Sequence, residues 1–243
     1  MPSRSHVQQF IDALAKVPAN KLSLTALAVA LGPTWDVESV KLKARQFDEA
    51  DTVPLCLVHG GLQYFGTERC KEPGVYKQLQ QGIKRSWATR ARIPRVDEVY
   101  ITCRSVNRGD GDWTTPDLVI SSTRKNATEL HAIEAEQPAG FDVRSVYQAY
   151  EQARGAGWAW VFYTGPAADE SAMRRVHRAA KELGVGVVHA PRPSQPSKWH
   201  TVLPARPREI TVEAERALRA RLGIESVDSV AAPDPFRVTN EAL

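Results

Sequence analysis

The sequence is poor in cysteine and contains no long hydrophobic run. Its three cysteines, Cys56, Cys70 and Cys103, lie far apart without a C-x-x-C pair. We therefore expect neither a disulfide framework nor a zinc site, and interpret them as buried thiols. No segment approaches the ~20 apolar residues that a membrane span needs, and the N-terminus MPSRSHVQQF lacks the apolar core of a signal peptide. These absences favour a cytoplasmic protein.

Two common catalytic signatures are also missing. The chain has neither a G-x-x-x-x-G-K-[ST] phosphate-binding loop nor a G-x-S-x-G nucleophile elbow, which argues against a P-loop nucleotide triphosphatase and against an acyl-transfer enzyme. No internal repeat is apparent, so a solenoid is not expected.

What the sequence does contain is the composition of a globular protein with an uneven charge distribution. The 243 residues are 42% hydrophobic and 25% charged, which is typical of one large domain or two small ones. Residues 1–95 hold 14 Lys and Arg against 8 Asp and Glu, whereas residues 96–243 hold 18 against 20. The N-terminal part is therefore where we expect a polyanion to bind.

The N-terminal part has three helical patterns followed by a hairpin signal. Apolar residues recur at helical spacing in residues 6–17, 23–32 and 36–50, and Gly60-Gly61 separates two apolar runs. This order over residues 1–70 resembles a winged helix-turn-helix domain. The resemblance implies that the third helix enters the major groove of double-stranded DNA and that the hairpin is the wing. The implied DNA-contacting residues are Ser39, Lys41, Lys43, Arg45 and Gln46 on the third helix and His59 on the wing. Winged helices also bind proteins, and in that alternative the basic residues form a solvated face.

A charged, Pro-Gly-containing stretch at residues 67–74 (TERCKEPG) is the predicted domain boundary. An amphipathic helix is expected at residues 75–92, with a basic end that either contacts substrate phosphate or only faces solvent. The basic residues of this end are Lys84, Arg85, Arg90, Arg92 and Arg95.

The most informative stretch runs from residue 112 to residue 136. It predicts two strands, residues 117–122 and 130–136, joined by a polar turn. Asp117 opens the first strand, while Glu134 and Glu136 lie two apart in the second and therefore point to one face. Burying carboxylates of like charge this close together without a counter-ion costs roughly several kcal/mol for each group. A divalent cation such as Mg²⁺ would remove that cost, because it prefers carboxylate oxygens.

Pro116-Asp117 followed by Glu134-x-Glu136 resembles the signature of the PD-(D/E)xK restriction-endonuclease-like family. The flanking pattern agrees, with a strand predicted at residues 96–104, a helix at 142–155 and a strand at 158–163. The resemblance implies an α/β (α+β) chain. Its domain at residues 71–205 would be a mixed sheet flanked by helices, and residues 206–243 would form a C-terminal helix and a loose tail.

The resemblance also implies a site and a cofactor. Mg²⁺ (or Mn²⁺) would be bound by Asp117, Glu134 and the carbonyl of Ala135, with Gln148, or as second choice Gln152, beside the metal. Glu136 stands where the family usually has lysine, a departure similar to the E-x-E form of some restriction enzymes. A carboxylate there can act as a base or bind a second cation, but it has the wrong charge for the electrostatic role of lysine. In the preceding loop, Asp110 and Asp112 are either further ligands or turn residues.

These observations lead to two main hypotheses. In the first, the chain is a Mg²⁺-dependent endonuclease that hydrolyses DNA phosphodiester bonds, for example in restriction or defence, and it can form a homodimer. The alternative is a non-catalytic DNA-binding protein whose nuclease fold serves as a scaffold or dimerisation domain. A third hypothesis is that the winged helix binds a protein partner.

Overall fold

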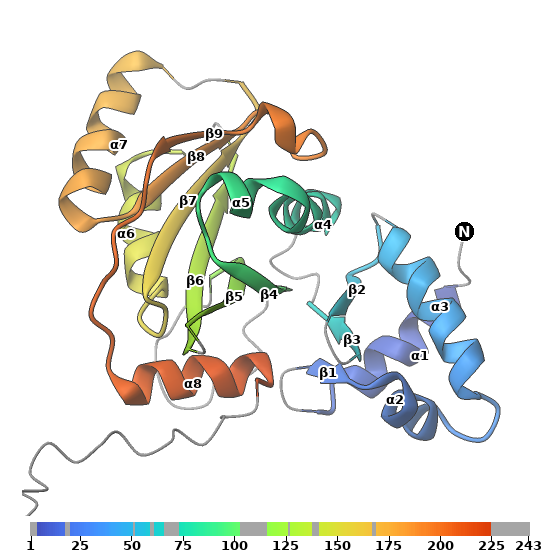
Figure 1. The fold of residues 1–243 in the computed structure, drawn as a ribbon. Coiled ribbons are helices and arrows are strands. Elements are labelled where there is room, and N and C mark those ends of the chain that lie inside the picture. Colours follow the sequence, from blue (N-terminus) through green and yellow to red (C-terminus); the bar gives the residue numbers. More distant parts are fainter. Residues whose placement is uncertain are drawn as a thin grey trace, which may run out of the picture.

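The computed structural model describes residues 4–17, 20–50, 52–58, 61–65, 73–102, 116–125, 127–137, 141–166 and 169–224. Within these residues the chain is mixed α/β, with a three-stranded and a six-stranded sheet (Figure 1). This confirms the predicted fold class. The described residues up to Phe65 are called the N-terminal module below, and those from Pro73 onward the second module.

The N-terminal module combines short helices with a small antiparallel sheet. Its described elements are α1 (Arg4–Leu14), β1 (Lys21–Leu22), α2 (Leu24–Leu31), α3 (Val37–Glu49), β2 (Leu55–Val58) and β3 (Gly61–Tyr64). Side chains fix where two of these helices begin. Ser23 Oγ accepts a hydrogen bond from Ala26 N at 3.1 Å before α2, and Asp36 Oδ1 accepts one from Ser39 N at 2.6 Å before α3. The predicted helices are therefore confirmed.

The small sheet differs from the prediction in two ways. Its strand order is β1-β3-β2, and the two-residue strand β1 was too short to leave a pattern. Gly61 was assigned to the hairpin turn, but it pairs with Val58 inside the ladder. A Cβ at Gly61 would lie 1.8 Å from Leu22 O, so this glycine allows β1 to approach β3 closely.

The second module is built on the six-stranded sheet, in the order β4-β5-β6-β7-β8-β9. Its described elements are α4 (Pro73–Gly82), a π-helical turn η2 (Ile83–Trp87), α5 (Ala88–Arg90), β4 (Arg95–Ile101), β5 (Leu118–Arg124), β6 (Ala127–Glu136), α6 (Val143–Gln152), β7 (Trp158–Thr164), α7 (Glu170–Leu183), β8 (Gly186–Ala190), η3 (Pro196–Lys198), β9 (His200–Leu203) and α8 (Val212–Leu222). The expected strand–strand–strand–helix–strand order from β4 to β7 is confirmed.

Helices cover both faces of this sheet. Strands β4, β5 and β6 are antiparallel, β6, β7 and β8 are parallel, and β9 closes one edge antiparallel. The run from α4 to α5 covers one face, and α6 and α7 cover the other (Figure 1). On the first face the ring of Trp87 packs edge-on against Trp160 and Phe162, at centroid distances of 5.1 and 4.8 Å. Such edge-to-face pairs add to the stabilisation from burial.

The basic end of the helix at residues 75–92 is partly occupied by structural contacts. Lys84 pairs with the buried Glu98. Arg90 donates to the carbonyls of Ser197 and Trp199, at 3.4 and 3.3 Å. For these two residues the structure favours a role in packing over contact with phosphate.

The C-terminal part of the described chain belongs to the core of the second module. Leu218 and Leu222 of α8 are buried in the same hydrophobic cluster as the large sheet. A Cβ at Gly155 would lie 2.4 Å from Ala214 O, so α8 lies directly on the loop after α6. Strand β9 was not predicted, because a Pro- and Ser-rich connector precedes it. Each described helix is too short or too polar to cross a membrane.

Candidate functional site

The register of one hairpin brings the predicted acids together. Strands β5 and β6 pair antiparallel with Leu118 opposite Ile133, so Asp117, immediately before β5, lies opposite Glu134. The backbone N–H of Ala135 donates a hydrogen bond to Asp117 Oδ2 at 2.9 Å. This contact fixes the Asp117 carboxylate at the end of the hairpin.

Glu134 is buried, and only one of its two carboxylate oxygens has a hydrogen-bond partner among the described residues. The residue is 5% exposed, and its Oε1 accepts a hydrogen bond from Gln148 Nε2 at 2.5 Å. The side chain of Gln152 opposes the rise in the pKa of this carboxyl group. The other oxygen, Oε2, is buried and has no hydrogen-bond partner among the described residues. A buried carboxylate oxygen without a partner is costly, which indicates that a proton or a cation belongs there.

The pKa values of all three acids are raised. Burial raises the pKa of Asp117 to about 7, with Glu136 adding to the effect and hydrogen bonds from Ala135 and Tyr76 opposing it. Burial, followed by the charges of Asp117 and Glu136, raises the pKa of Glu134 well above its usual value. Burial and the charge of Asp142 raise the pKa of Glu136. The three acids therefore resist carrying their charges together without a counter-ion.

The donor set fits a hard divalent cation. Asp117 and Glu134 offer carboxylate oxygens, and the predicted third ligand is the carbonyl of Ala135, whose N–H is already used by Asp117. Within the described ranges, no group of three or more His, Cys, Asp or Glu side chains is placed to hold a metal. Glu136 therefore stands near the pair rather than completing a third carboxylate ligand. Asp110 and Asp112 lie outside the described residues.

Helix α6 supplies both predicted polar neighbours. The Asp142 side chain accepts a hydrogen bond from Arg144 N at 2.7 Å and starts the helix. Gln148 and Gln152 lie four residues apart, hence on one face. Gln148 donates to Glu134, and the side chain of Gln152 opposes the rise in the Glu134 pKa. The sequence favours Gln148 over Gln152 and leaves open that both only face solvent, whereas the structure places both beside Glu134.

Two residues near the acids were not predicted as part of the site. Tyr76 lies in the helix predicted at residues 75–92, and it hydrogen-bonds Asp117. Asp142 lies at the start of the helix predicted at residues 142–155, and its charge acts on Glu136. No pattern in the sequence marks Tyr76, because its partner is 41 residues away in another element.

The candidate DNA-contacting residues of α3 lie on two sides of that helix. Val40, Ala44 and Phe47 are buried. At 3.6 residues per turn, Lys41 and Lys43 lie roughly 160° apart at opposite edges of the outward face.

Their contacts differ accordingly. Lys41 is 3.6 Å from Glu38, and Lys43 Nζ donates to Gln46 Oε1 at 3.1 Å. Ser39, Arg45 and Gln46 are exposed. His59 lies outside the described residues.

The outward face of α3 is not uniformly basic. Leu42 is 59% exposed on it. A hollow of about 400 Å³, lined in part by Trp35, Ser39, Leu42 and Lys43, lies beside it. This face therefore offers polar, cationic and apolar contacts together.

No protein-family model matches the chain, and none of the curated proteins matches it.

Proposed function

We propose that the chain is a Mg²⁺-dependent endonuclease that hydrolyses phosphodiester bonds in double-stranded DNA. The observation that carries this proposal is the buried Glu134 Oε2, which has no partner among the described residues and lies in a carboxylate opposite Asp117. A buried pair of acids with raised pKa values destabilises the folded protein when it is left without a counter-ion. Such a pair is suited to binding a cation. The family resemblance of Pro116-Asp117 and Glu134-x-Glu136 is consistent with this proposal.

Each residue of the site has a role in this reaction. Asp117 and Glu134 would hold the cation, while Ala135 N–H and Gln148 orient the two carboxylates. When bound, Mg²⁺ would supply charge stabilisation at a phosphoryl oxygen and at the attacking water. Glu136 accepts the proton of the attacking water. Without a bound cation, burial and the charge of Asp142 raise the pKa of Glu136, which favours its binding of a proton.

The N-terminal module is proposed to bind the DNA. Its element order, from α1 through β1, α2 and α3 to the hairpin β2–β3, with the sheet order β1-β3-β2, supports the resemblance to a winged helix. In that arrangement α3 is the helix that enters the major groove. The exposed Arg45, Ser39 and Gln46 have side chains that hydrogen-bond base edges or phosphates.

Two observations favour the alternatives. Glu136 adds negative charge where the related nucleases usually have lysine, which suits a non-catalytic scaffold. The exposed Leu42 and Val37 of α3, at 59% and 38%, suit a protein partner.

The test is cleavage of supercoiled plasmid in the presence of Mg²⁺ or Mn²⁺. We expect the wild type to nick the plasmid and Asp117→Asn to lose the activity, while Glu151→Gln, an exposed acid on α6, retains it. EDTA should abolish cleavage by the wild type. A wild type that binds duplex DNA without cutting it would support the scaffold, and a wild type that does neither would support the protein-partner alternative.

A further inference from the structure

A buried lysine joins the two modules. Lys77 of α4 is 2% exposed, and its Nζ donates hydrogen bonds to the carbonyls of Phe47, Asp48 and Ala50 at 2.7, 3.1 and 2.8 Å. These carbonyls lie at the C-terminal end of α3. The last carbonyls of a helix have no partner within the helix and form the negative end of its dipole, so a buried ammonium group is well placed there.

The residue next to Lys77 contacts the acidic site. Tyr76 hydrogen-bonds Asp117, and one turn later Gln80 Nε2 donates to Val99 O of β4 at 2.6 Å. The first turns of α4 therefore contact the end of α3, the candidate metal ligand and the edge of the large sheet. The path from α3 to Asp117 consists of two consecutive residues of one helix.

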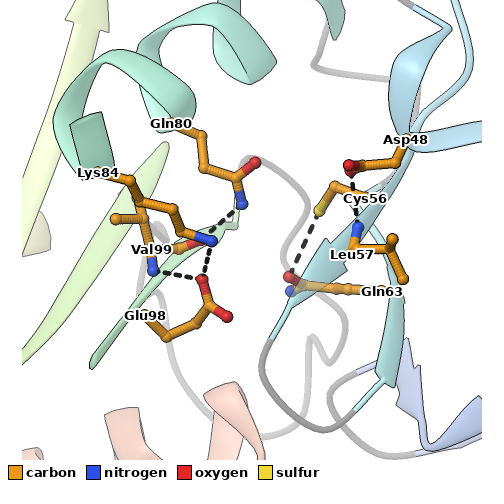
Figure 2. Close-up of polar contacts among 8 residues, drawn as sticks. All are labelled: Asp48, Cys56, Leu57, Gln63, Gln80, Lys84, Glu98 and Val99. Carbon is orange, nitrogen blue, oxygen red and sulfur yellow. Dashed lines mark hydrogen bonds and ion pairs between the residues drawn. The ribbon is translucent and has the colours of Figure 1, made fainter. Parts of the chain in front are cut away.

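The modules also share a hydrophobic core around this path. Cys56, Val58 and Phe65 belong to the N-terminal module, but they pack in the same cluster as Leu79 and Val99. Figure 2 shows the hairpin β2–β3, with Cys56 and Gln63, facing α4 and β4. Burial also raises the pKa of the Cys56 thiol to about 12, so it is an inert part of this core.

A second polar link lies at the periphery of the same interface. Lys21 Nζ of β1 donates to Gly223 O, just after α8, at 3.3 Å. The same ammonium lies 5.6 Å from the centroid of the Tyr100 ring. Contacts at two separated points resist rotation of one module against the other.

We propose that Lys77 is a positioning residue that fixes α3 at one distance and orientation relative to Asp117. This inference rests on the proposed function, in which α3 reads DNA and Asp117 belongs to the cleavage site. A rigid connection holds α3 at a constant distance from the acidic site. The phosphodiester bond that is cut therefore lies a constant number of base pairs from those that α3 contacts. The preferred substrate is then duplex DNA long enough to span both sites.

The chemistry of lysine suits this role. Three hydrogen-bond donors on one flexible stem satisfy three carbonyls that do not lie in one plane. Without the ammonium group, the carbonyls of Phe47, Asp48 and Ala50 lose this donor. Water can replace the lost hydrogen bonds only if the interface between the modules opens. Loss of Lys77 should therefore loosen the relation between the modules without altering the acids themselves.

The test compares Lys77→Met with Lys84→Met. Methionine keeps an unbranched side chain but removes the donors. Lys84 is a matched control on the same helical run, since it pairs with Glu98 inside the second module. A preferred duplex is first selected from a random pool with the wild type, and the cut positions of each variant on that duplex are then mapped by sequencing. Thermal unfolding without DNA gives a second readout that does not depend on cleavage.

The wild type and Lys84→Met should cut at the same position, and Lys77→Met should cut at several neighbouring positions with its Mg²⁺ requirement unchanged. In the melting experiment, Lys77→Met should replace one cooperative transition with two, because the N-terminal module unfolds separately. If Lys77→Met does not fold, Lys77→Gln, which keeps one amide donor group, takes its place in both measurements.

An unchanged cut position together with a single transition would overturn the inference and leave the proposed function intact. If the wild type does not cut DNA, the proposed function fails, and the number of transitions alone decides whether Lys77 joins the modules.

Discussion

Replacement of Asp117 by asparagine tests whether the acidic site destabilises the protein when no cation is bound. Asparagine has nearly the same shape, and its oxygen can still accept the hydrogen bond from Ala135 N–H. The pKa of Asp117 is raised from 3.8 to about 7 in the folded protein. The folded state therefore holds this proton more tightly than the unfolded state. Its contribution to stability is present at low pH and is lost as the pH rises between these two values.

The size of the effect follows from the pKa. At about 1.4 kcal/mol per pH unit, the full loss is about 4 kcal/mol, of which more than half falls between pH 5 and pH 8. Asp117→Asn removes this titrating group, and it also removes the charge that helps to raise the pKa of Glu134. The variant should therefore lose less stability than the wild type over the same pH range.

The assay is urea unfolding at pH 5 and pH 8 in EDTA. We expect the free energy of unfolding of the wild type to fall by roughly 2–3 kcal/mol more than that of Asp117→Asn. Adding Mg²⁺ at pH 8 should restore the wild type and have little effect on the variant, because a ligand of the folded state stabilises it by mass action. Glu151→Gln serves as the control for loss of a surface acid. Equal pH dependence of the wild type and Asp117→Asn would refute the reasoning.

Three further predictions concern single contacts. Glu136→Ala should reduce cleavage by about 10²–10⁴ or more while gel-shift binding of DNA is retained; equal cleavage by the variant would contradict the role of Glu136 as base. Gln148→Leu removes the donor to Glu134 and should weaken Mg²⁺ binding roughly 10–100-fold, measured as the Mg²⁺ concentration that raises the melting temperature. The prediction fails if that concentration is unchanged. Lys41→Ala and Arg45→Ala should each reduce the slope of log affinity against log salt by about one, measured by fluorescence anisotropy, and an unchanged slope in the double variant would favour a protein partner for α3.

The acidic hairpin could be predicted from the sequence because all its information is local. Val119 and Ile120 gave the first strand its β-propensity, and Ile133 did so in the second. The spacing of Glu134 and Glu136 placed both on one face. The helices that begin after Ser23, Asp36 and Asp142 could also be predicted, since a cap and its helix are adjacent in sequence. Such features require no knowledge of the tertiary structure.

Features that depend on distant partners could not be predicted. Lys77 lies in the helix predicted at residues 75–92, but its partner carbonyls lie 27 to 30 residues earlier in the chain, where no local pattern could reveal them. Gly61 carried a turn signal, but its close approach to Leu22 gives it a place inside a strand. A lysine can lie on the surface or be buried, and a glycine can lie in a turn or in a strand. Tertiary packing determines which of these environments each residue occupies.

The connection between β5 and β6 has a consequence for the order in which the protein folds. Arg124 of β5 pairs with Ala127 of β6, and a hairpin closed this tightly can form within about 1–10 μs. The parallel pairing of β6 with β7 requires the longer crossover through α6. We therefore expect Asp117 and Glu134 to meet early in folding, while water still screens their charges. Their repulsion grows only when α6 docks and excludes that water, so the supply of divalent cations should influence the late packing of α6 more than the formation of the hairpin.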